Sequence, residues 1–221
     1  MTSSAGTIRR VQGRIQMCLQ FMPSLLRHRA LRHTDRHNGA MESLRGQLLV
    51  AGPDLLDPNF RRSVLLVGEH GDEGAMGVIL NRPSPVSVAD AVPPLADLVD
   101  DTDLVHVGGP VQPQAIVVLG DFRDPDEAAA LVLGSIGFLP AEIESAADVG
   151  SLDRARVFAG YAGWGPGQLE SEIAEEPWII EQALPEDVFT EDPEDLWSAV
   201  LRRKGGAFAV LAQMPPDPSS N

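Results

Sequence analysis

The sequence predicts a single α+β domain with a mixed, largely antiparallel sheet and several helices. Three observations favour this fold class. First, a chain of 221 residues, 43% of them apolar, can build one sizeable core. Second, short apolar runs bounded by turn residues are typical of hairpins. Third, helical patterns fall irregularly between these runs, whereas a parallel α/β sheet would alternate them with the strands.

Nine short apolar runs predict the strands. The runs at 63–68 and 76–80 flank a polar loop with two glycines, which suits a hairpin. The apolar residues at 64–67 are continuous rather than alternating, so we expect both faces of that strand to be covered. The predicted strands are residues 47–51, 63–68, 76–80, 104–107, 115–119, 136–139, 156–159, 178–182 and 207–211.

Helices are predicted between and after these strands. Ser87 suits the N-cap of a helix that Pro93 and Pro94 would split, because proline lacks the backbone donor that a helix interior needs. Pro140 suits a first helical position. The predicted helices are residues 88–99, 126–133, 140–147, a polar segment after Gly167, and 193–203, which has one apolar face.

A glycine-rich stretch at 160–172 is the predicted functional surface. It joins the predicted strand 156–159 to the polar helix and contains Tyr161 and Trp164. We interpret it as a strand-to-helix turn, and such loops often hold binding groups on a rigid scaffold.

Residues 1–40 read as a basic extension that is separate from the domain at 41–214. They contain seven arginines and one acid, a formal charge of +6, and apolar residues at three- or four-residue steps between 8 and 26. Pro23 interrupts that pattern. The extension is interpreted as a disordered arm or as the product of a wrongly assigned start before Met41; a membrane-surface helix is the alternative. Residues 215–221 are expected to form a loose tail.

Charge and cysteine content exclude several classes of site. The chain has a net charge of −15, which leaves −21 on residues 41–221, so a direct nucleic-acid-binding face is disfavoured there. The sole cysteine, Cys18, lies in the extension, which excludes a disulfide framework and fits a reducing cytoplasm. His33 and His37 have the spacing of a helical metal pair but lack a third ligand. No run reaches the roughly 20 apolar residues of a membrane span, so we predict a soluble protein. Because the sequence has no metal-ligand set and no cofactor-binding loop, we also predict that it holds no metal or cofactor.

Seven motifs, in this order and spacing, resemble the AlgH/YqgE family of bacterial proteins. The resemblance covers roughly residues 44–211, and the first forty residues have no counterpart in it. The motifs are residues 46–51 (GQLLVA), 57–64 (DPNFRRSV), 69–70 (EH), 77–83 (GVILNRP), 108–111 (GGPV), 161–164 (YAGW) and 166–172 (PGQLESE).

The resemblance implies more about fold than about function. It implies a compact α+β domain whose sheet bends into a partial barrel with helices around it. The biochemical function of the family is uncharacterised. One branch is named as a regulator of alginate production, which is a genetic label without an agreed mechanism.

His70, beside Glu69, is the best candidate for a general base, because histidine titrates near neutrality. No nucleophile is identifiable for it to activate, since the sequence has no Gly-x-Ser-x-Gly motif and Cys18 lies in the extension. The alternative is a hydrogen-bonded turn histidine. We therefore assign no catalytic residue. His106, between two valines, is interpreted as an outward or hydrogen-bonded strand residue.

Candidate binding residues lie in two places. Arg62 and Arg82, which follows Asn81, could each clamp a carboxylate or phosphate, or could pair with acids of this acidic domain. Tyr161 and Trp164 could line a pocket or anchor a partner, or could close the core beneath the turn.

The polar helix after Gly167 begins with Gln168, Glu170 and Glu172. The two glutamates are about 200° apart around a helix of 3.6 residues per turn, so they cannot form a close acid–base pair. The turn lacks a Gly-Lys-Ser/Thr phosphate motif, and acids at this position favour the helix N-terminus electrostatically. Acidic clusters elsewhere are interpreted as solvated surface.

Three hypotheses of function remain open. The first is a cytoplasmic, non-enzymatic binding or regulatory protein that holds an unknown protein or small molecule through Arg62, Asn81, Arg82, Tyr161, Trp164, Gln168 and Glu170. The second is a hydrolase-like enzyme that uses His70 and an acid, with Arg82 or Arg62 binding an anionic substrate. Convergence of His70, Arg82 and Glu170 on one cleft would support it. The third is a transcriptional regulator that reaches DNA through a partner or through the basic extension.

Overall fold

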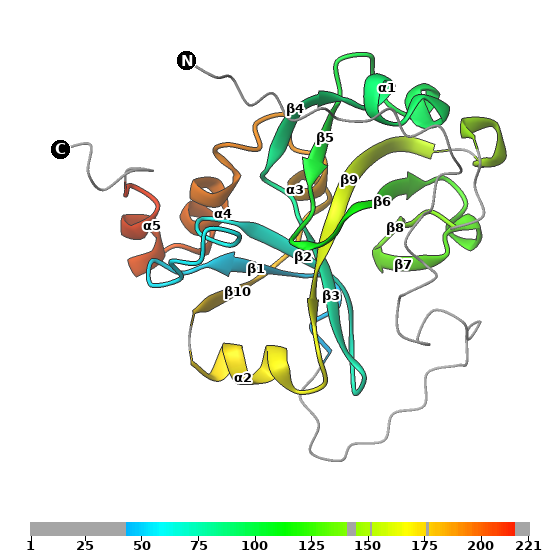
Figure 1. The fold of residues 1–221 in the computed structure, drawn as a ribbon. Coiled ribbons are helices and arrows are strands. Elements are labelled where there is room, and N and C mark those ends of the chain that lie inside the picture. Colours follow the sequence, from blue (N-terminus) through cyan, green and yellow to red (C-terminus); the bar gives the residue numbers. More distant parts are fainter. Residues whose placement is uncertain (1–42, 141–144, 151, 176, 215–221) are drawn as a thin grey trace, which may run out of the picture.

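The computed structural model describes residues 43–140, 145–150, 152–175 and 177–214 (Figure 1). The predicted extension at 1–40 and tail at 215–221 lie outside the described residues. The described chain forms one domain with a large, mainly antiparallel sheet and several helices, as the α+β prediction requires.

One half of the sheet has the order β10-β1-β2-β3, and every neighbouring pair is antiparallel. The β2–β3 hairpin was predicted, but its strands are longer than expected and turn at residues 72 and 73. These strands are β1 (Gln47–Ala51), β2 (Val64–Gly71), β3 (Gly74–Ile79) and β10 (Trp178–Gln182).

The other half of the sheet is built around β6 (Val111–Phe122), which pairs with β8 (Ile136–Phe138), and β8 pairs with β7 (Ala130–Leu133). On the other side, β4 (Pro83–Ser87) pairs with β5 (Leu104–Val107). β5 runs parallel to β9 (Leu152–Trp164), with His106 opposite Phe158. This parallel pairing joins residues that are 52 positions apart in the sequence, such as His106 and Phe158, and forms part of the site described below.

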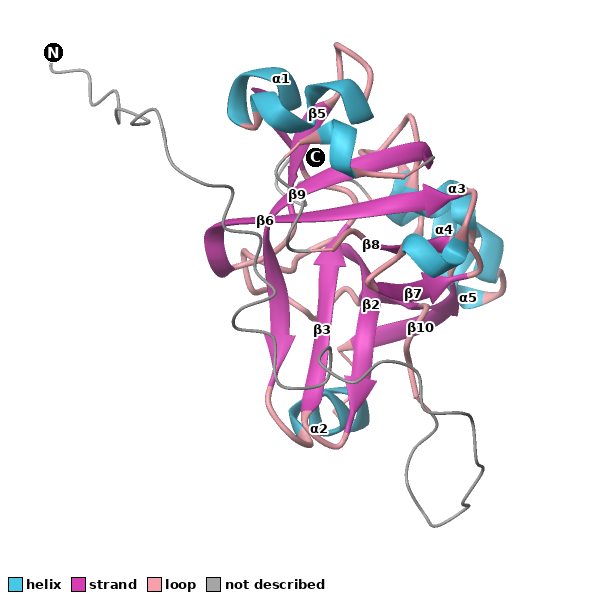
Figure 2. Ribbon diagram, turned by 90° about the vertical axis from the view of Figure 1, so that its right-hand side faces the viewer, coloured by secondary structure: helices cyan, strands magenta, loops and turns pink. Residues whose placement is uncertain are grey.

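The long strand β9 (Leu152–Trp164) joins the two halves. Its first part pairs with β6, and its last residues, Ala162–Trp164, pair with β3. Between them Gly160 has φ 72°, and a Cβ there would lie 2.6 Å from the carbonyl oxygen of Gly109. Only glycine fits such a position without strain. Figure 2 shows β9 passing from one half to the other; the sheet ends at β10 and β7 and does not close into a barrel.

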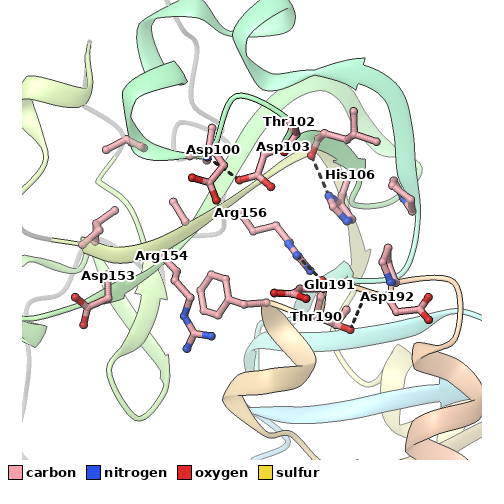
Figure 3. Close-up of a pocket in the computed structure, with 18 of the residues that line it drawn as sticks. Asp100, Thr102, Asp103, His106, Asp153, Arg154, Arg156, Thr190, Glu191 and Asp192 are labelled. Carbon is pink, nitrogen blue, oxygen red and sulfur yellow. Dashed lines mark hydrogen bonds between the residues drawn. The ribbon is translucent and has the colours of Figure 1, made fainter.

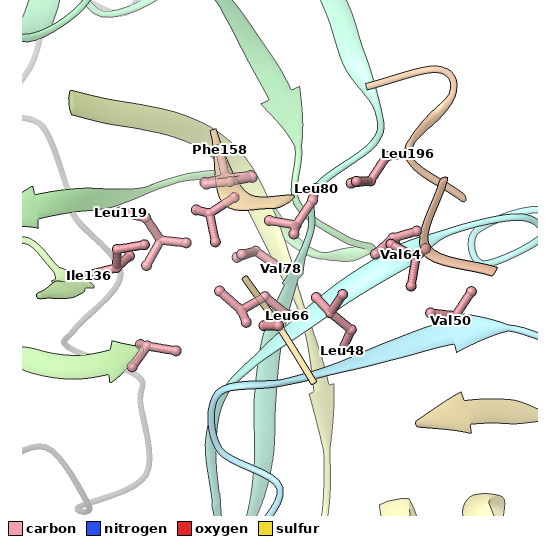
Figure 4. Packing of buried hydrophobic residues seen from close by; sticks show 14 of the residues in the cluster. Leu48, Val50, Val64, Leu66, Val78, Leu80, Leu119, Ile136, Phe158 and Leu196 are labelled. Carbon is pink, nitrogen blue, oxygen red and sulfur yellow. The ribbon is translucent and has the colours of Figure 1, made fainter. Parts of the chain in front are cut away.

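Alternate residues of β1 and β2 enter different cores, which explains their continuous apolar sequence. Leu48 and Leu66 face a core shared with β6, β8 and the C-terminal helices (Figure 4). Leu49 and Leu65 face a second core beneath helix α2 (Gln168–Ala174). Both faces are buried, as predicted. The helices that cover the first core are α3 (Pro185–Val188), α4 (Leu196–Lys204) and α5 (Ala207–Leu211).

A third core lies between the β6–β9 face and the segment 88–98. That segment splits at Pro93, as predicted, into α1 (Val88–Ala91) and the 3₁₀ helix η3 (Pro93–Leu98). The Ser87 hydroxyl caps α1 by accepting from the backbone N–H of Asp90 at 3.1 Å.

Two predicted elements are wrong. Residues 126–133 do not form a helix: a short 3₁₀ turn, η4 (Pro125–Glu127), precedes β7, whose pairing with β8 outweighs the helix propensity of the alanines. Residues 207–211 do not form a strand but helix α5, because Gly205 and Gly206 take positive φ values of 77° and 58° and turn the chain back against α4. Of the predicted helix 140–147, residues 141–144 lie outside the described residues, and η5 (Ala146–Asp148) is a 3₁₀ turn.

The turn in the stretch 160–172 is shorter than its glycines predicted. β9 continues to Trp164, so Tyr161 and Trp164 lie on a strand. The turn is confined to residues 165–167, and Gly167, with φ 73°, precedes α2 (Gln168–Ala174).

Candidate functional site

Asn81 and Arg82 hold the loop before β2 in place. The Asn81 Oδ1 accepts from the Val64 backbone N–H at 2.8 Å, and its Nδ2 donates to the Arg62 carbonyl oxygen at 2.9 Å. The Arg82 guanidinium donates to the carbonyl oxygens of Pro58 and Arg61 at 3.2 and 3.1 Å. Both side chains therefore hold backbone groups of this loop: Asn81 binds one N–H and one carbonyl, and Arg82 binds two carbonyls.

Arg62 lies in the same loop before β2 and is bound by Asn81. Its φ of 55° is unusual for a residue with a side chain, and the hydrogen bond from Asn81 holds its carbonyl in place. Its guanidinium lies 4.0 Å from the centre of the Trp197 ring and donates to the Met214 carbonyl oxygen at 2.8 Å. Burial, with a smaller effect of neighbouring Arg61, lowers the pKa of Arg62.

His70 lies at the far end of β2 and uses both ring nitrogens. Its Nδ1 accepts from the Leu44 backbone N–H at 2.9 Å, so the neutral ring carries its proton on Nε2 and donates it to Glu170 Oε1, also at 2.9 Å. The side chain is only 3% exposed. A hydrogen bond from its own backbone N–H and another from His70 lower the pKa of Glu170. His70 is thus a hydrogen-bonded histidine with no nitrogen open to a substrate.

Glu172 binds the two tryptophans of the second core. Its Oε2 accepts from Trp164 Nε1 at 2.9 Å and from Trp178 Nε1 at 3.0 Å. Its Oε1 accepts from Gln168 Nε2 at 3.1 Å, and Gln168 Oε1 in turn accepts from the Gly165 N–H. Glu170 and Glu172 therefore point to different partners, as predicted. Sequence reasoning did not foresee the indole contacts.

We call these residues at the end of β9 the α2 corner: His70, Trp164, Gln168, Glu170, Glu172 and Trp178. Trp164 is 7% exposed and packs edge-on against Trp178, with ring centres 6.4 Å apart. Tyr161 is half-buried and packs on the first core. His70 and Arg82 lie at opposite ends of the β2–β3 hairpin. His70, Arg82 and Glu170 therefore do not converge on one cleft.

A cavity of about 900 Å³ lies at the opposite end of β9 (Figure 3). Its walls are β5, the start of β9, the segment 97–103 and the segment 189–194. We call it the β5–β9 cavity. None of the seven predicted binding residues lines it, and neither does His70. Their part in binding stays a prediction.

His106 lies on β5 at this cavity and is 5% exposed. Its Nδ1 donates to the Leu104 carbonyl oxygen at 3.1 Å, which leaves a lone pair on Nε2. Within the described part of the chain Nε2 has no hydrogen-bond partner. Desolvation, and then the nearby Arg156 charge, lower the pKa of His106 to about 4, so the ring is neutral at pH 7. The sequence predicted an outward or hydrogen-bonded strand residue; His106 lies on a strand, and its Nδ1 is hydrogen-bonded whereas its Nε2 is not.

Two arginines of β9 build the cavity wall. Arg156 donates to the carbonyl oxygens of Val188 and Thr190 at 2.8 and 2.7 Å, and so ties the segment 189–194 to the sheet. Arg154 pairs with Asp121 at 3.0 Å and lies 4.5 Å from the centre of the Phe189 ring. Burial lowers the pKa of Arg156, which Asp103 partly offsets. Both guanidinium groups already have acceptors.

Carboxylates dominate the lining. Seven acids and two arginines give a formal charge of −5 with His106 neutral. Asp103 accepts from the Asp100 N–H, Asp153 pairs with Arg123, and Asp192 accepts from the Asp195 N–H. The other four carboxylates are exposed and have no hydrogen bond or ion pair to a described residue: Asp97, Asp100, Glu191 and Glu194. In the sequence, only the acids at 97–103 point to this acidic lining, and the pattern there is also that of a solvated surface.

The described residues were also compared with the requirements of a metal site and of a membrane span. Among the described residues, no three His, Cys, Asp or Glu side chains are arranged to hold a metal ion. Likewise, no helix in the described ranges is long and apolar enough to cross a membrane.

Comparison with known proteins gives consistent matches. Residues 48–209 match the model of the AlgH-like family. UPF0301 proteins of Streptomyces avermitilis and Streptomyces coelicolor are 43% and 44% identical to this chain over 187 residues, which is 82% of this chain and 97% of each relative.

Two solved structures share the fold at 28% identity. The crystal structure of protein DIP2367 from Corynebacterium diphtheriae has a TM-score of 0.70, covering 82% of this chain and 95% of that one. The solution structure of the AlgH protein from Pseudomonas aeruginosa has a TM-score of 0.60, covering 82% and 100%. The resemblance noted in the sequence is thereby confirmed, and this chain belongs to the AlgH-like family.

Proposed function

We propose that this protein is a non-enzymatic binding or regulatory module of the cytosol, and that its ligand occupies the β5–β9 cavity. One observation carries the proposal: His106 Nε2 is a buried acceptor at the cavity with no partner among the described residues. Burying an acceptor without a hydrogen bond costs about 1–3 kcal/mol. A ligand that donates to this nitrogen would offset that cost.

The chemistry of the lining supports binding rather than catalysis. Its only side-chain hydroxyls are those of Thr102 and Thr190, and the Thr190 hydroxyl already accepts from the Asp192 N–H. With a pKa near 4, His106 is a weak base at neutral pH. A general base acts best with a pKa near the working pH. The cavity is thus equipped to hold a ligand and poorly equipped to activate a nucleophile.

No specific observation favours the hydrolase alternative. His70 donates from one nitrogen and accepts at the other, and Arg82 is bound to backbone carbonyls at the other end of the hairpin. The sole cysteine in the sequence agrees with a reducing compartment, which supports the cytosolic setting.

The test is an NMR screen of the full chain. Cationic, neutral and anionic small molecules are added to ¹⁵N-labelled protein, and backbone and histidine-ring shifts are followed. We expect hits to move the signals of residues 97–106, 152–156 and 189–194, together with His106 Nε2. Hits confined to the α2 corner or to Arg62, Asn81 and Arg82 would overturn the proposal, as would no hit of any charge class.

A further inference from the structure

We infer that the β5–β9 cavity binds an uncharged polyhydroxylated ligand of the sugar class, one of whose hydroxyl groups donates to His106 Nε2. This inference rests on the proposed function and names the class of ligand. It combines three features of the cavity: a buried acceptor, charges that disfavour an ionised group beside that acceptor, and a threonine hydroxyl on the facing wall.

The histidine selects a hydrogen-bond donor. His106 is 5% exposed, and its Nε2 has no partner among the described residues. The Nε2 lone pair can only accept, because the ring proton is on Nδ1 and is donated to the Leu104 carbonyl oxygen. Figure 3 shows the ring projecting from β5 toward the segment that carries Thr190 and Asp192. A ligand group that meets Nε2 must therefore offer an O–H or an N–H.

Charge selects an uncharged donor. Burial, and then the Arg156 charge, lower the pKa of His106. A cation at Nε2 would meet the same positive charge and the same loss of water, so both effects disfavour it. An anion is disfavoured as well, because the lining has a formal charge of −5 and residues 41–221 have −21. The ligand group at His106 is therefore neutral.

The facing wall selects a hydroxyl among the neutral donors. The Thr190 Oγ1 accepts from the Asp192 N–H at 3.2 Å, and its own proton has no acceptor among the described residues. That hydroxyl can therefore donate, whereas His106 Nε2 can only accept. A hydroxyl group both donates and accepts, so adjacent hydroxyls of one ligand can satisfy both walls. An amide N–H can donate to His106 but cannot accept from Thr190.

The rest of the lining suits the body of a sugar. Apolar side chains offer surface to its C–H groups, and the volume of about 900 Å³ lies within the roughly 300–1,000 Å³ that is usual for small-molecule sites. The free carboxylates are exposed, so water competes with the ligand for them and they contribute little to binding. The apolar lining residues are Leu98, Val99, Leu104, Leu152 and Phe189.

NMR titration of the full chain with sugars tests the inference. The neutral probes are glucose, galactose, mannose, maltose and trehalose. Glucosamine, at a pH where it is protonated, and glucuronate present a similar ring with a positive or a negative charge, and N-acetylglycinamide is neutral with N–H donors but no hydroxyl. We expect at least one neutral sugar to bind saturably and to move the His106 Nε2 resonance. We expect the charged sugars to bind at least about tenfold more weakly, and the amide not to saturate.

Substitutions at His106 separate the hydrogen bond from the fold. His106→Gln offers an amide oxygen in place of Nε2, whereas His106→Phe keeps a ring without an acceptor. We expect binding of the neutral sugar to weaken about tenfold in His106→Phe and less than about threefold in His106→Gln. Backbone amide spectra check that both variants fold. If His106→Phe does not, Thr190→Val takes its place, with an expected weakening of about threefold.

Two pairs of substitutions test the exposed carboxylates. Asp100→Asn with Glu191→Gln removes two charges from the cavity, and Asp54→Asn with Glu73→Gln removes two from exposed acids outside it. Amide oxygens still accept from hydroxyls, so we expect less than about a twofold change in sugar binding for both pairs. All four residues are exposed, so both variants should fold.

The inference would be overturned if a charged sugar bound as tightly as the neutral one, or if removing the acceptor at His106 or the hydroxyl at Thr190 left binding unchanged. A loss of binding confined to Asp100→Asn with Glu191→Gln would place the sugar on the exposed acids and would also overturn it. If no sugar moved the His106 signals while another compound of the screen did, the inference would fall and the proposed function would stand with a different ligand. If no compound moved them, both would fall.

Discussion

The α2 corner and the β5–β9 cavity lie at opposite ends of the same strand, and they differ in how far their polar groups are satisfied. In the α2 corner, His70, Glu170 and Glu172 all have side-chain partners within hydrogen-bond distance. In the cavity, His106 Nε2 and four carboxylates have none among the described residues. The four carboxylates are exposed, so water can solvate them, whereas His106 Nε2 is a buried acceptor without a partner among the described residues.

The sequence predicts the functional surface at 160–172, whereas the buried acceptor without a partner lies at the β5–β9 cavity. The glycines and aromatic residues at 160–172 stand out in the sequence, yet Gly160 fits a close approach of two chains, and Trp164 closes a core. The acids at 97–103 look like ordinary surface. They border the cavity because β5 pairs with β9 and places them beside Arg154 and Arg156.

The largest expected effect is that of Trp164→Ala in the α2 corner. The substitution removes a buried ring and one of the donors to Glu172, so we expect the free energy of unfolding to fall by about 3–5 kcal/mol. Urea denaturation at pH 7.5 measures it. Trp164→Phe, which keeps a ring but loses the indole N–H, should cost less. A loss below about 1 kcal/mol for Trp164→Ala would show that this corner is not a structural unit.

The next effect is a pH dependence due to His106. Its pKa is about 4 in the folded protein and about 6.5 in the unfolded chain. Between these values the unfolded chain binds the proton, so stability is full above pH 6.5 and is lost as the pH falls toward 4. From pH 7.5 to 5 this group should cost about 2 kcal/mol.

Comparison of the wild type with His106→Gln isolates that contribution, because the carboxylates titrate in both proteins. The wild type should lose about 2 kcal/mol more than the variant over this range. Equal losses would mean that His106 is not held neutral, which would remove the distinction between the cavity and the α2 corner.

A smaller effect is expected for Glu170→Gln. The lowered pKa of Glu170 means that its charged form stabilises the fold above its unfolded pKa, and that this stabilisation is lost as the pH falls through the folded value. The Glu170 side chain is 34% exposed, and glutamine can still accept from His70, so we expect only about 0.5–1 kcal/mol at pH 7. The difference from the wild type should shrink on acidification; a difference that grew would contradict the pairing.

The predictable parts of this protein are local. The strands at Gln47–Ala51 and Trp178–Gln182 coincide with their apolar runs, and Ser87 and Pro93 mark the start and the split of the segment 88–98. The errors arise where pairing with another segment determines the secondary structure. Residues 130–133 form β7 rather than part of the predicted helix because they pair with β8. The cavity could not be foreseen for the same reason, since His106 and Arg156 meet only through the parallel pairing of β5 with β9.

The smallest effect has the opposite sign. In Asp100→Asn with Glu191→Gln, two like charges leave a cavity of charge −5 without loss of any hydrogen bond to a described side chain, so stability should rise by up to about 0.5 kcal/mol. The gain should be present at 10 mM salt and absent at 500 mM, where the Debye length is far shorter. Urea denaturation of this variant and of Asp54→Asn with Glu73→Gln, at both salt concentrations, measures it. A loss of stability at low salt would show that these carboxylates hold the fold, as those of the α2 corner do, and are not free for a ligand.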